Sequence, residues 1–201
     1  MTPEKSDDEK RFGRTEEVYA VGAVIVAWNL CESALLQLLF RTLKLEWRTA
    51  SRTFHLMGDR AVMSLLANEC PQWLDDNELP RVMAFISAYA ACLENRNIIA
   101  HSQINMNDVL GGVSLQKASR KDGSSVNRFY ISADEMKTIA STMYDLAQYG
   151  AKLSLSIWAG PLRTLQAGEK NVAVPLPDLF HTPRKLAPLP EGQSGPLAED
   201  A

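Results

Sequence analysis

Apolar residues recur at helical spacing along four stretches of this chain. The stretches cover about residues 15–45, 48–69, 80–105 and 132–158, with apolar positions mostly three or four residues apart. Pro71 is expected to end the second helix, and Pro80 suits the first turn of the third. Consecutive helices with short connections predict an all-α fold, an antiparallel helical bundle of four or five helices.

The helical spacing is interrupted before the last helix. Residues 111–115 and 126–131 hold β-branched and aromatic positions on either side of a polar turn. They predict a small β-hairpin, with a disordered loop as the alternative. Ser132 and Glu135 then have the spacing of a capping box, which predicts the start of the last helix.

The two ends of the chain differ in composition from the part between them. Residues 1–14 are polar and charged and predict a flexible N-terminal arm, whereas residues 15–165 hold the helical pattern. From Gly168 onward lie six of the ten prolines and few large apolar residues. We therefore expect residues 166–201 to be a proline-rich, largely disordered tail, which is a plausible docking segment for a protein partner.

Composition and charge are those of an ordinary globular protein. Hydrophobic residues make up 46% and charged residues 22%, and the net charge of −3 argues against a broad nucleic-acid-coating surface but not against a local basic patch. Three cysteines without paired spacing indicate reduced thiols, and hence the cytoplasm. Residues 18–40 carry one charge, Glu32, near their centre, so a buried core helix is preferred to a membrane span.

Polar residues interrupt the apolar pattern of the third helix. At about 100° per residue, Asn97 and His101 fall on one stripe, with Arg96 at its edge. The apolar members of that stripe are Val82, Ile86, Ala90, Leu93 and Ile104. An unpaired buried polar group costs roughly 1–3 kcal/mol, so these side chains need partners. Three apolar residues off the stripe, Cys92, Ile98 and Ile99, suggest a second contact surface, such as a dimer interface.

Glu32 on the first helix is expected to face the core and to supply that partner. One interpretation is a buried structural ion pair between Glu32 and Arg96. The other makes the pairing functional, with Glu32 orienting Arg96 or His101 beside a polar pocket.

The pattern Arg96-Asn97-x-x-x-His101 resembles the motif of the HEPN superfamily (higher eukaryotes and prokaryotes nucleotide-binding domains). That motif is an arginine, usually followed by a polar residue, and a histidine four to six residues further on. Glu32 is also similar to a glutamate in the first helix of many such domains. Two residues after His101 this chain has Gln103, where the toxin–antitoxin branch carries a tyrosine, so the resemblance excludes that branch.

The resemblance implies a metal-independent endoribonuclease that acts as a homodimer, with the two motifs meeting across the interface, in phage defence or stress response. Arg96 and His101 would be the catalytic pair, Asn97 would orient the phosphate or the histidine, and Glu32 would support them. The residue types suit that chemistry, since histidine moves protons near neutral pH and arginine holds phosphate. No metal-ligand spacing is present, and neither metal nor cofactor is expected.

Four cations could track an RNA backbone. In a continuous helix Arg41, Lys44, Arg48 and Arg52 would share one face, although a solvated helix edge explains the same pattern. The alternative function is a non-catalytic interaction or nucleotide-binding module, in which Glu32, Arg96 and His101 form a structural polar network. An enzyme needs His101 accessible, whereas the network predicts that it is buried and fully hydrogen-bonded.

Overall fold

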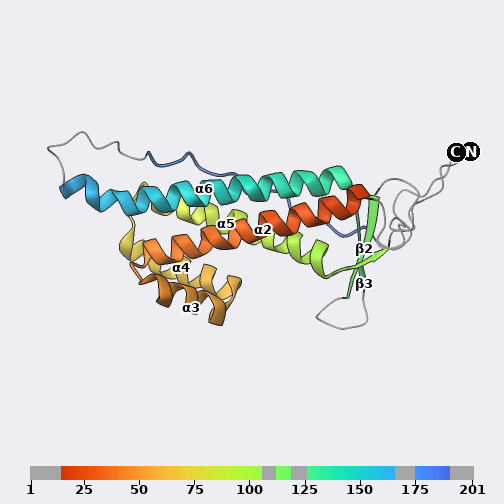
Figure 1. Ribbon diagram of the computed structural model, residues 1–201, viewed down its shortest axis with the longest axis horizontal. Coiled ribbons are helices and arrows are strands. Elements are labelled where there is room, and N and C mark those ends of the chain that lie inside the picture. The colour runs from red at the N-terminus through yellow and green to blue at the C-terminus, as the bar shows by residue number, and fades with distance from the viewer. Residues whose placement is uncertain (1–14, 106–111, 119–125, 166–174, 191–201) are drawn as a thin grey trace, which may run out of the picture. The chain divides into compact units, whose positions relative to one another are not determined.

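The computed structural model describes residues 15–105, 112–118, 126–165 and 175–190 of the chain. The chain divides into two compact units. Figure 1 shows its helices and strands. The sheet unit comprises Met1–Ala27, Leu93–Ser141 and Arg184–Ala201, and the helical unit comprises Trp28–Cys92 and Thr142–Pro183. Each unit is described by itself, within the residues given above.

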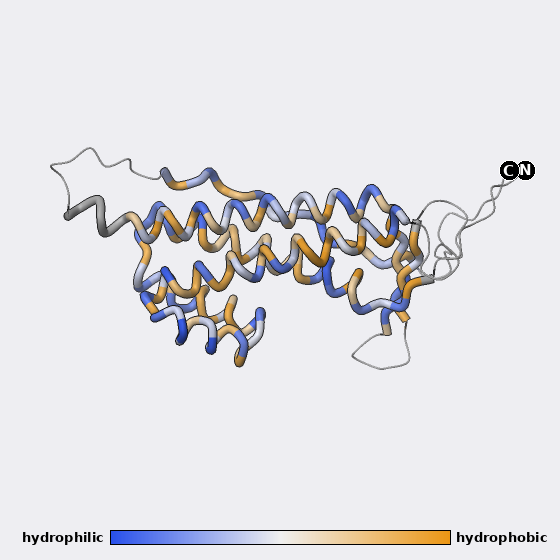
Figure 2. Tube along the Cα trace, in the orientation of Figure 1, coloured by the Kyte–Doolittle hydropathy of each residue, from blue (hydrophilic) through white to orange (hydrophobic). Residues whose placement is uncertain are grey.

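The described part of the chain is mostly helical. Its helices are α2 (Thr15–Thr42), α3 (Trp47–Met57), α4 (Asp59–Trp73), α5 (Leu79–His101) and α6 (Ala133–Leu165). Three antiparallel strands, β1 (Gln103–Asn105), β2 (Gly112–Ala118) and β3 (Val126–Ser132), precede α6. Hydrophobic and hydrophilic residues are interspersed along each helix, as expected where one side of a helix packs on a core (Figure 2).

The single helix predicted over residues 48–69 is two helices. Gly58 separates α3 from α4 with a φ of 72°, a left-handed conformation that glycine adopts without steric cost. Pro71 does not end the second of them, and this prediction was wrong. It is exposed and lies inside α4, whose last turn is closed by the Leu74 N–H bonding to the Cys70 carbonyl at 3.0 Å.

Aromatic packing fills the core of the helical unit. Trp28 of α2 and Tyr89 of α5 are fully buried with ring centroids 4.7 Å apart, and Phe85 lies 5.8 Å from Tyr89. Gly150 of α6 allows close approach, since a Cβ there would lie 2.5 Å from Phe85 Cε2. Tyr149 of α6 is also buried. The aliphatic and sulfur-containing members of this core include Leu35, Leu38, Leu39, Leu66, Met143, Leu146 and Leu153.

The sheet unit is larger than the predicted hairpin by one strand. β2 and β3 pair from Gly112↔Ser132 to Ala118↔Val126, and β1 adds Gln103↔Gln116 at the other edge of β2. The core of this unit draws on strands and helices alike, and its members include Val24, Ile99, Val113, Leu115, Phe129, Ile131 and Met136. The third helix was expected to reach residue 105, but it ends at His101 and its last predicted residues form β1.

A reciprocal cap begins α6, as the spacing of Ser132 and Glu135 predicted. The Ser132 N–H bonds to Glu135 Oε2 at 2.8 Å, and the Glu135 N–H bonds to Ser132 Oγ at 3.1 Å.

Residues 175–190, here called the C-terminal strap, form an extended segment without regular secondary structure. In the helical unit Arg81 Nε donates to the Pro177 carbonyl at 2.7 Å, and Ser156 Oγ donates to the Pro175 carbonyl at 3.0 Å. In the sheet unit the Leu189 N–H donates to the Arg128 carbonyl at 2.8 Å. The pattern of apolar residues at helical spacing gave no indication of these contacts. The remainder of the predicted tail and the predicted N-terminal arm lie outside the described residues.

Among the described residues one helix, α2, is long and apolar enough to cross a membrane by length and composition. Core helices of soluble proteins and signal sequences pass the same test, so the observation is weak evidence. In each unit α2 contributes buried residues to the core, with Val24 in one and Trp28 in the other fully buried.

Candidate functional site

Arg96, Asn97 and His101 come together on the last two turns of α5, in the sheet unit. Arg96 Nη1 donates to Asn97 Oδ1 at 3.0 Å and lies 3.0 Å from His101 Nε2. The five-residue spacing of a helix brings the arginine within reach of the histidine one turn and a half further on. The three residues singled out from the sequence therefore form one hydrogen-bonded group.

The Arg96–His101 contact indicates which ring nitrogen of His101 carries the proton in this arrangement. Guanidinium nitrogens only donate hydrogen bonds, so His101 Nε2 must accept. An accepting Nε2 carries no proton, and the ring proton of the neutral imidazole then sits on Nδ1. His101 thus presents its basic nitrogen to a cation that a phosphate could engage instead.

The side of α5 on which these residues lie differs from the prediction. His101 and Ile104 are exposed, and Arg96 and Asn97 are half-buried, so they do not face the core. The buried residues of this part of α5 are Leu93, Asn95, Ile98 and Ile99. The helix packs with the two isoleucines inward because they bury more apolar surface than Asn97 and His101 would. Ile98, Ile99 and Cys92 are accordingly core residues rather than a second, exposed contact surface.

Asn95 is the buried polar residue that helical periodicity missed. It is 2% exposed and uses both ends of its amide on the strap. Its Nδ2 donates to the Arg184 carbonyl at 3.0 Å, and its Oδ1 accepts the Leu186 N–H at 2.8 Å. Beside it, Glu94 and Lys185 form an ion pair at 2.9 Å. The buried amide of Asn95 is therefore satisfied by main-chain groups that lie about 90 residues further along the sequence.

Lys117 of β2 is a second residue that the sequence did not single out. Its Nζ donates to the Asn97 carbonyl at 3.1 Å, in the last turn of α5. Cations are stabilised at the C-terminal end of a helix. Arg96 and Lys117 therefore place two positive charges close to His101 at this end of α5. Only the packing of the sheet against α5 brings Lys117 there, so no local sequence signal could have identified it.

Glu32 lies in the helical unit, half-buried on α2. Its surroundings within that unit include Tyr89 and Cys31. Burial raises the pKa of Tyr89, and the negative charges of Asp59 and Glu32 raise it further. Burial likewise raises the pKa of the Cys31 thiol, with smaller contributions that include Glu32. The pairing of Glu32 with Arg96 or His101 stays a prediction.

The four cations expected along one helix do not share a helical face. α2 ends at Thr42, Lys44 has a φ of 51° in the connection, and α3 begins at Trp47. Arg41 lies over the ring of Trp158 and Lys44 over that of Trp73, at 5.2 and 5.4 Å from the ring centroids. Arg48 and Arg52 remain together on α3.

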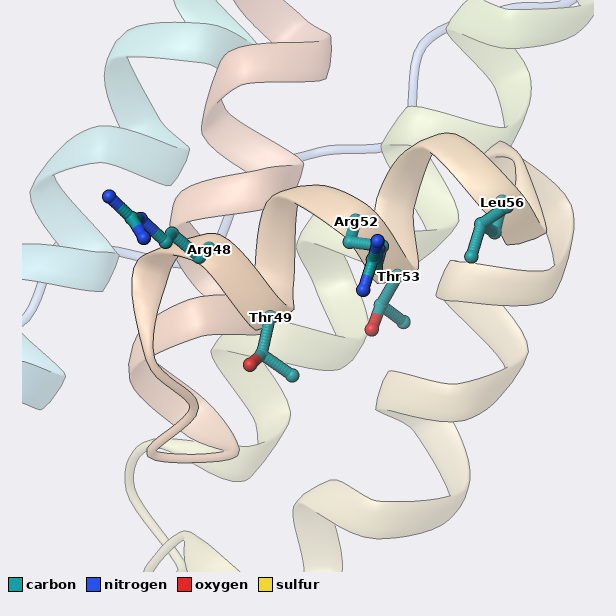
Figure 3. A pocket seen from close by; sticks show the side chains of 5 residues that line it. All are labelled: Arg48, Thr49, Arg52, Thr53 and Leu56. Carbon is teal, nitrogen blue, oxygen red and sulfur yellow. The ribbon is translucent and has the colours of Figure 1, made fainter.

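Arg48 and Arg52 line a hollow of about 450 Å³ with Thr49, Thr53 and Leu56. Figure 3 shows the five side chains following one another along α3. Guanidinium and hydroxyl groups are common ligands of phosphate oxygens. Two of the four predicted RNA-binding cations therefore line one hollow, together with two threonines and Leu56.

Within the described residues, no group of three or more His, Cys, Asp or Glu side chains could hold a metal ion. Comparison of the chain with protein-family models, with curated proteins and with solved structures finds no match.

Proposed function

We propose that this chain is an HEPN-like helical bundle and acts as a metal-independent endoribonuclease. The observation that carries the proposal is the 3.0 Å contact between Arg96 Nη1 and an exposed His101 Nε2. A phosphate-binding fork and a proton acceptor in contact are the two groups that cleavage by the RNA 2′-hydroxyl requires. The structural network that we considered as the alternative predicts a buried His101, and the exposure of His101 counts against it.

The proposed reaction begins with an exchange of partners at Arg96. The guanidinium of Arg96 binds the scissile phosphate instead of His101. His101 Nε2 is then free to accept the proton of the 2′-hydroxyl. The 2′-oxygen then attacks phosphorus, the bond to the 5′-oxygen breaks, and a 2′,3′-cyclic phosphate forms. The leaving 5′-oxygen takes a proton from water or from the His101 of a second copy in the proposed homodimer.

Two nearby side chains support this assignment. Asn97 Oδ1 accepts from the same Arg96 Nη1 and so holds the guanidinium toward His101. Lys117 adds a second fixed cation beside the group, which favours the negative charge that develops on the phosphate oxygens. Glu32 is kept in the proposal as a supporting residue of Arg96 or His101.

The homodimer in this proposal would form through the outer side of α2. Val18, Tyr19 and Val26 lie on one side of that helix and are 45, 69 and 64% exposed. They belong to the same unit as the Arg96–His101 pair. An outward apolar helix face of this kind is typical of a contact surface. Val26→Asp is expected to shift the sedimentation velocity profile from dimer to monomer, and an unchanged profile would place any dimer contact elsewhere.

The setting that we propose is the cytoplasm, in phage defence or stress response. All three cysteines are buried and free, as a reducing compartment allows.

The test is cleavage of total tRNA in EDTA by the wild type and by His101→Ala at matched folding and oligomeric state. His181→Ala is the matched control, because His181 is an exposed histidine on the strap. Cleavage in EDTA that is lost with His101→Ala and kept with His181→Ala supports the proposal. Equal cleavage by all three proteins would place the activity elsewhere or in a contaminant, and would contradict the role of His101.

A further inference from the structure

Three of the four tryptophans of the chain are exposed, and all three lie close to the C-terminal end of α2. Trp28 is fully buried, whereas Trp47, Trp73 and Trp158 are 53, 50 and 54% exposed. Each exposed ring contacts a residue of the last turn of α2 or of the connection that follows it. All belong to the helical unit, so their relative positions are part of one compact body.

Cations accompany these rings. Arg41 lies over Trp158 and Lys44 over Trp73, while Trp47 meets Phe40 edge-on at 5.8 Å between centroids. Two guanidinium nitrogens of Arg41, Nε and Nη1, are buried and have no hydrogen-bond partner among the described residues. Buried donors without partners are costly.

The hollow on α3 begins with Arg48, the residue that follows Trp47 in the sequence. Arg48 and Arg52 lie one turn apart, each followed by a threonine hydroxyl, and the 80%-exposed Leu56 closes the row (Figure 3). The ring-bearing residues and the hollow together define what we call the tryptophan surface, comprising Trp47, Trp73, Trp158, Arg41, Lys44 and the α3 hollow.

We propose that the tryptophan surface binds single-stranded RNA. Unpaired bases stack on the exposed indoles, and the backbone phosphates bind the guanidiniums and threonine hydroxyls of α3. Base stacking on aromatic rings tolerates any sequence, because every base has a π-face, and arginine adds cation–π attraction. The choice of RNA as the nucleic acid rests on the proposed function, but the surface itself lies on other residues than the Arg96–His101 pair.

Two features favour RNA over a lipid surface. Membrane-binding helices present a continuous apolar face, whereas here two of the three rings lie against cations. Four of the five side chains that line the α3 hollow are arginines or threonines, and the fifth is Leu56. Base-paired RNA is also disfavoured, because its bases are stacked on one another and offer no free face to an indole.

Tryptophan fluorescence tests the proposal in the full chain carrying His101→Ala, titrated with a single-stranded 12-mer of oligouridylate. Stacking is expected to quench the emission of the exposed tryptophans, leaving that of buried Trp28. The double substitution Trp73→Leu/Trp158→Leu is expected to weaken binding at least tenfold, measured by fluorescence anisotropy of a labelled 12-mer. Tyr144→Leu is the matched control, since Tyr144 is 50% exposed on α6 about four turns before Trp158.

Salt and ligand competition complete the test. Arg48→Gln/Arg52→Gln is expected to reduce the dependence of log Kd on log salt, since each lost phosphate contact removes about 0.7 from the slope for single strands. Equal affinity for duplex RNA would overturn the proposal. So would an emission blue shift with phosphatidylcholine–phosphatidylserine vesicles and no response to the oligonucleotide.

The outcomes separate this inference from the proposed activity. Quenching and binding without cleavage by the wild type would support the tryptophan surface and contradict the ribonuclease. Cleavage without quenching, and unaffected by the tryptophan substitutions, would support the ribonuclease and overturn the surface. The quenching experiment keeps all four tryptophans and changes only the exposed His101, so the proposal does not depend on the stability of the double substitution.

Discussion

Arg96 holds His101 by a contact of 3.0 Å between Nη1 and Nε2 at the C-terminal end of α5. The same nitrogen donates to Asn97, so the guanidinium is oriented before any substrate arrives. Preorganised donors lower a transition-state barrier more than mobile ones, because no reorganisation is needed during the reaction.

Under the proposed ribonuclease function, we expect Arg96→Lys to lower kcat for RNA cleavage about 100-fold while changing RNA affinity much less. Lysine keeps the charge but lacks the planar guanidinium that contacts Asn97 and His101 and that would bind a phosphate in the proposed reaction. Single-turnover cleavage and separate binding titrations check this split. Arg60→Lys, at an exposed arginine of α4, is the control and should cleave at the wild-type rate. A wild-type rate for Arg96→Lys would show that the fork has no part in the reaction.

The sequence predicted those parts of the fold that depend on neighbours along the chain. The cap between Ser132 and Glu135 forms as expected, and so do the strands of the hairpin, because both follow from residues a few positions apart. The break at Gly58 was missed because an isolated glycine does not by itself separate a helix end from a tolerated interior position.

For the candidate site the sequence identified the residues but not their side of the helix. The apolar residues of α5 permit more than one stripe, and the stripe chosen from Val82 and Leu93 put Asn97 and His101 inward. Packing instead buries Ile98 and Ile99, which leaves His101 exposed. The roles of Lys117 and of the strap could not be predicted from the sequence. Their contacts with Asn97 and Asn95 join main-chain groups to side chains that lie far apart along the chain.

Asn95 holds the part of the strap that belongs to the sheet unit. Asn95→Ala removes both amide contacts and leaves the Leu186 N–H and the Arg184 carbonyl without their partners. We expect the strap to detach locally, so that trypsin cuts after Arg184 and Lys185 at least tenfold faster than in the wild type. Limited proteolysis followed by mass spectrometry measures this.

The control for this experiment is Asn97→Ala on the same helix, whose side chain bonds to Arg96 and not to the strap. It should leave the cleavage rate at Arg184 and Lys185 unchanged. Equal rates for Asn95→Ala and the wild type would mean that other contacts hold the strap.

Two helical glycines should respond to alanine with opposite signs. At Gly150 a Cβ would lie 2.5 Å from Phe85 Cε2 and 3.0 Å from Ala34 Cβ, and Phe85 is fully buried. We expect Gly150→Ala to lower the free energy of unfolding by about 1–3 kcal/mol through overpacking. Gly22 has nothing within 4 Å of the added Cβ, so Gly22→Ala should raise it by about 0.5–1 kcal/mol.

Urea denaturation at low protein concentration, where the proposed dimer is dissociated, measures both glycine variants against the wild type. The intrinsic helix propensity that alanine adds is the same at both positions. The difference between the two variants therefore reports the space around each added Cβ. A stabilising Gly150→Ala would mean that α6 and α5 are farther apart than the structure has them.

The buried thiols predict a loss of stability in alkali. Burial raises the pKa of Cys70 and of Cys92 to about 12. In the unfolded chain a thiol titrates near about 8.5. Below that pH both states keep the proton, and stability does not depend on these groups. Above it the unfolded state binds fewer protons than the folded state, so the free energy of unfolding falls as pH rises toward about 12.

The slope reaches about 1.4 kcal/mol per pH unit for each thiol. Urea denaturation from pH 7 to 10.5, without oxygen, measures this slope. Cys70→Ala is expected to make it shallower by about 1 kcal/mol per pH unit above pH 9.5, whatever the variant loses at pH 7 through the cavity it creates. The change in slope is therefore the readout, and the stability at neutral pH is its internal reference. Identical slopes for variant and wild type would mean that the Cys70 thiolate is solvated in the folded protein.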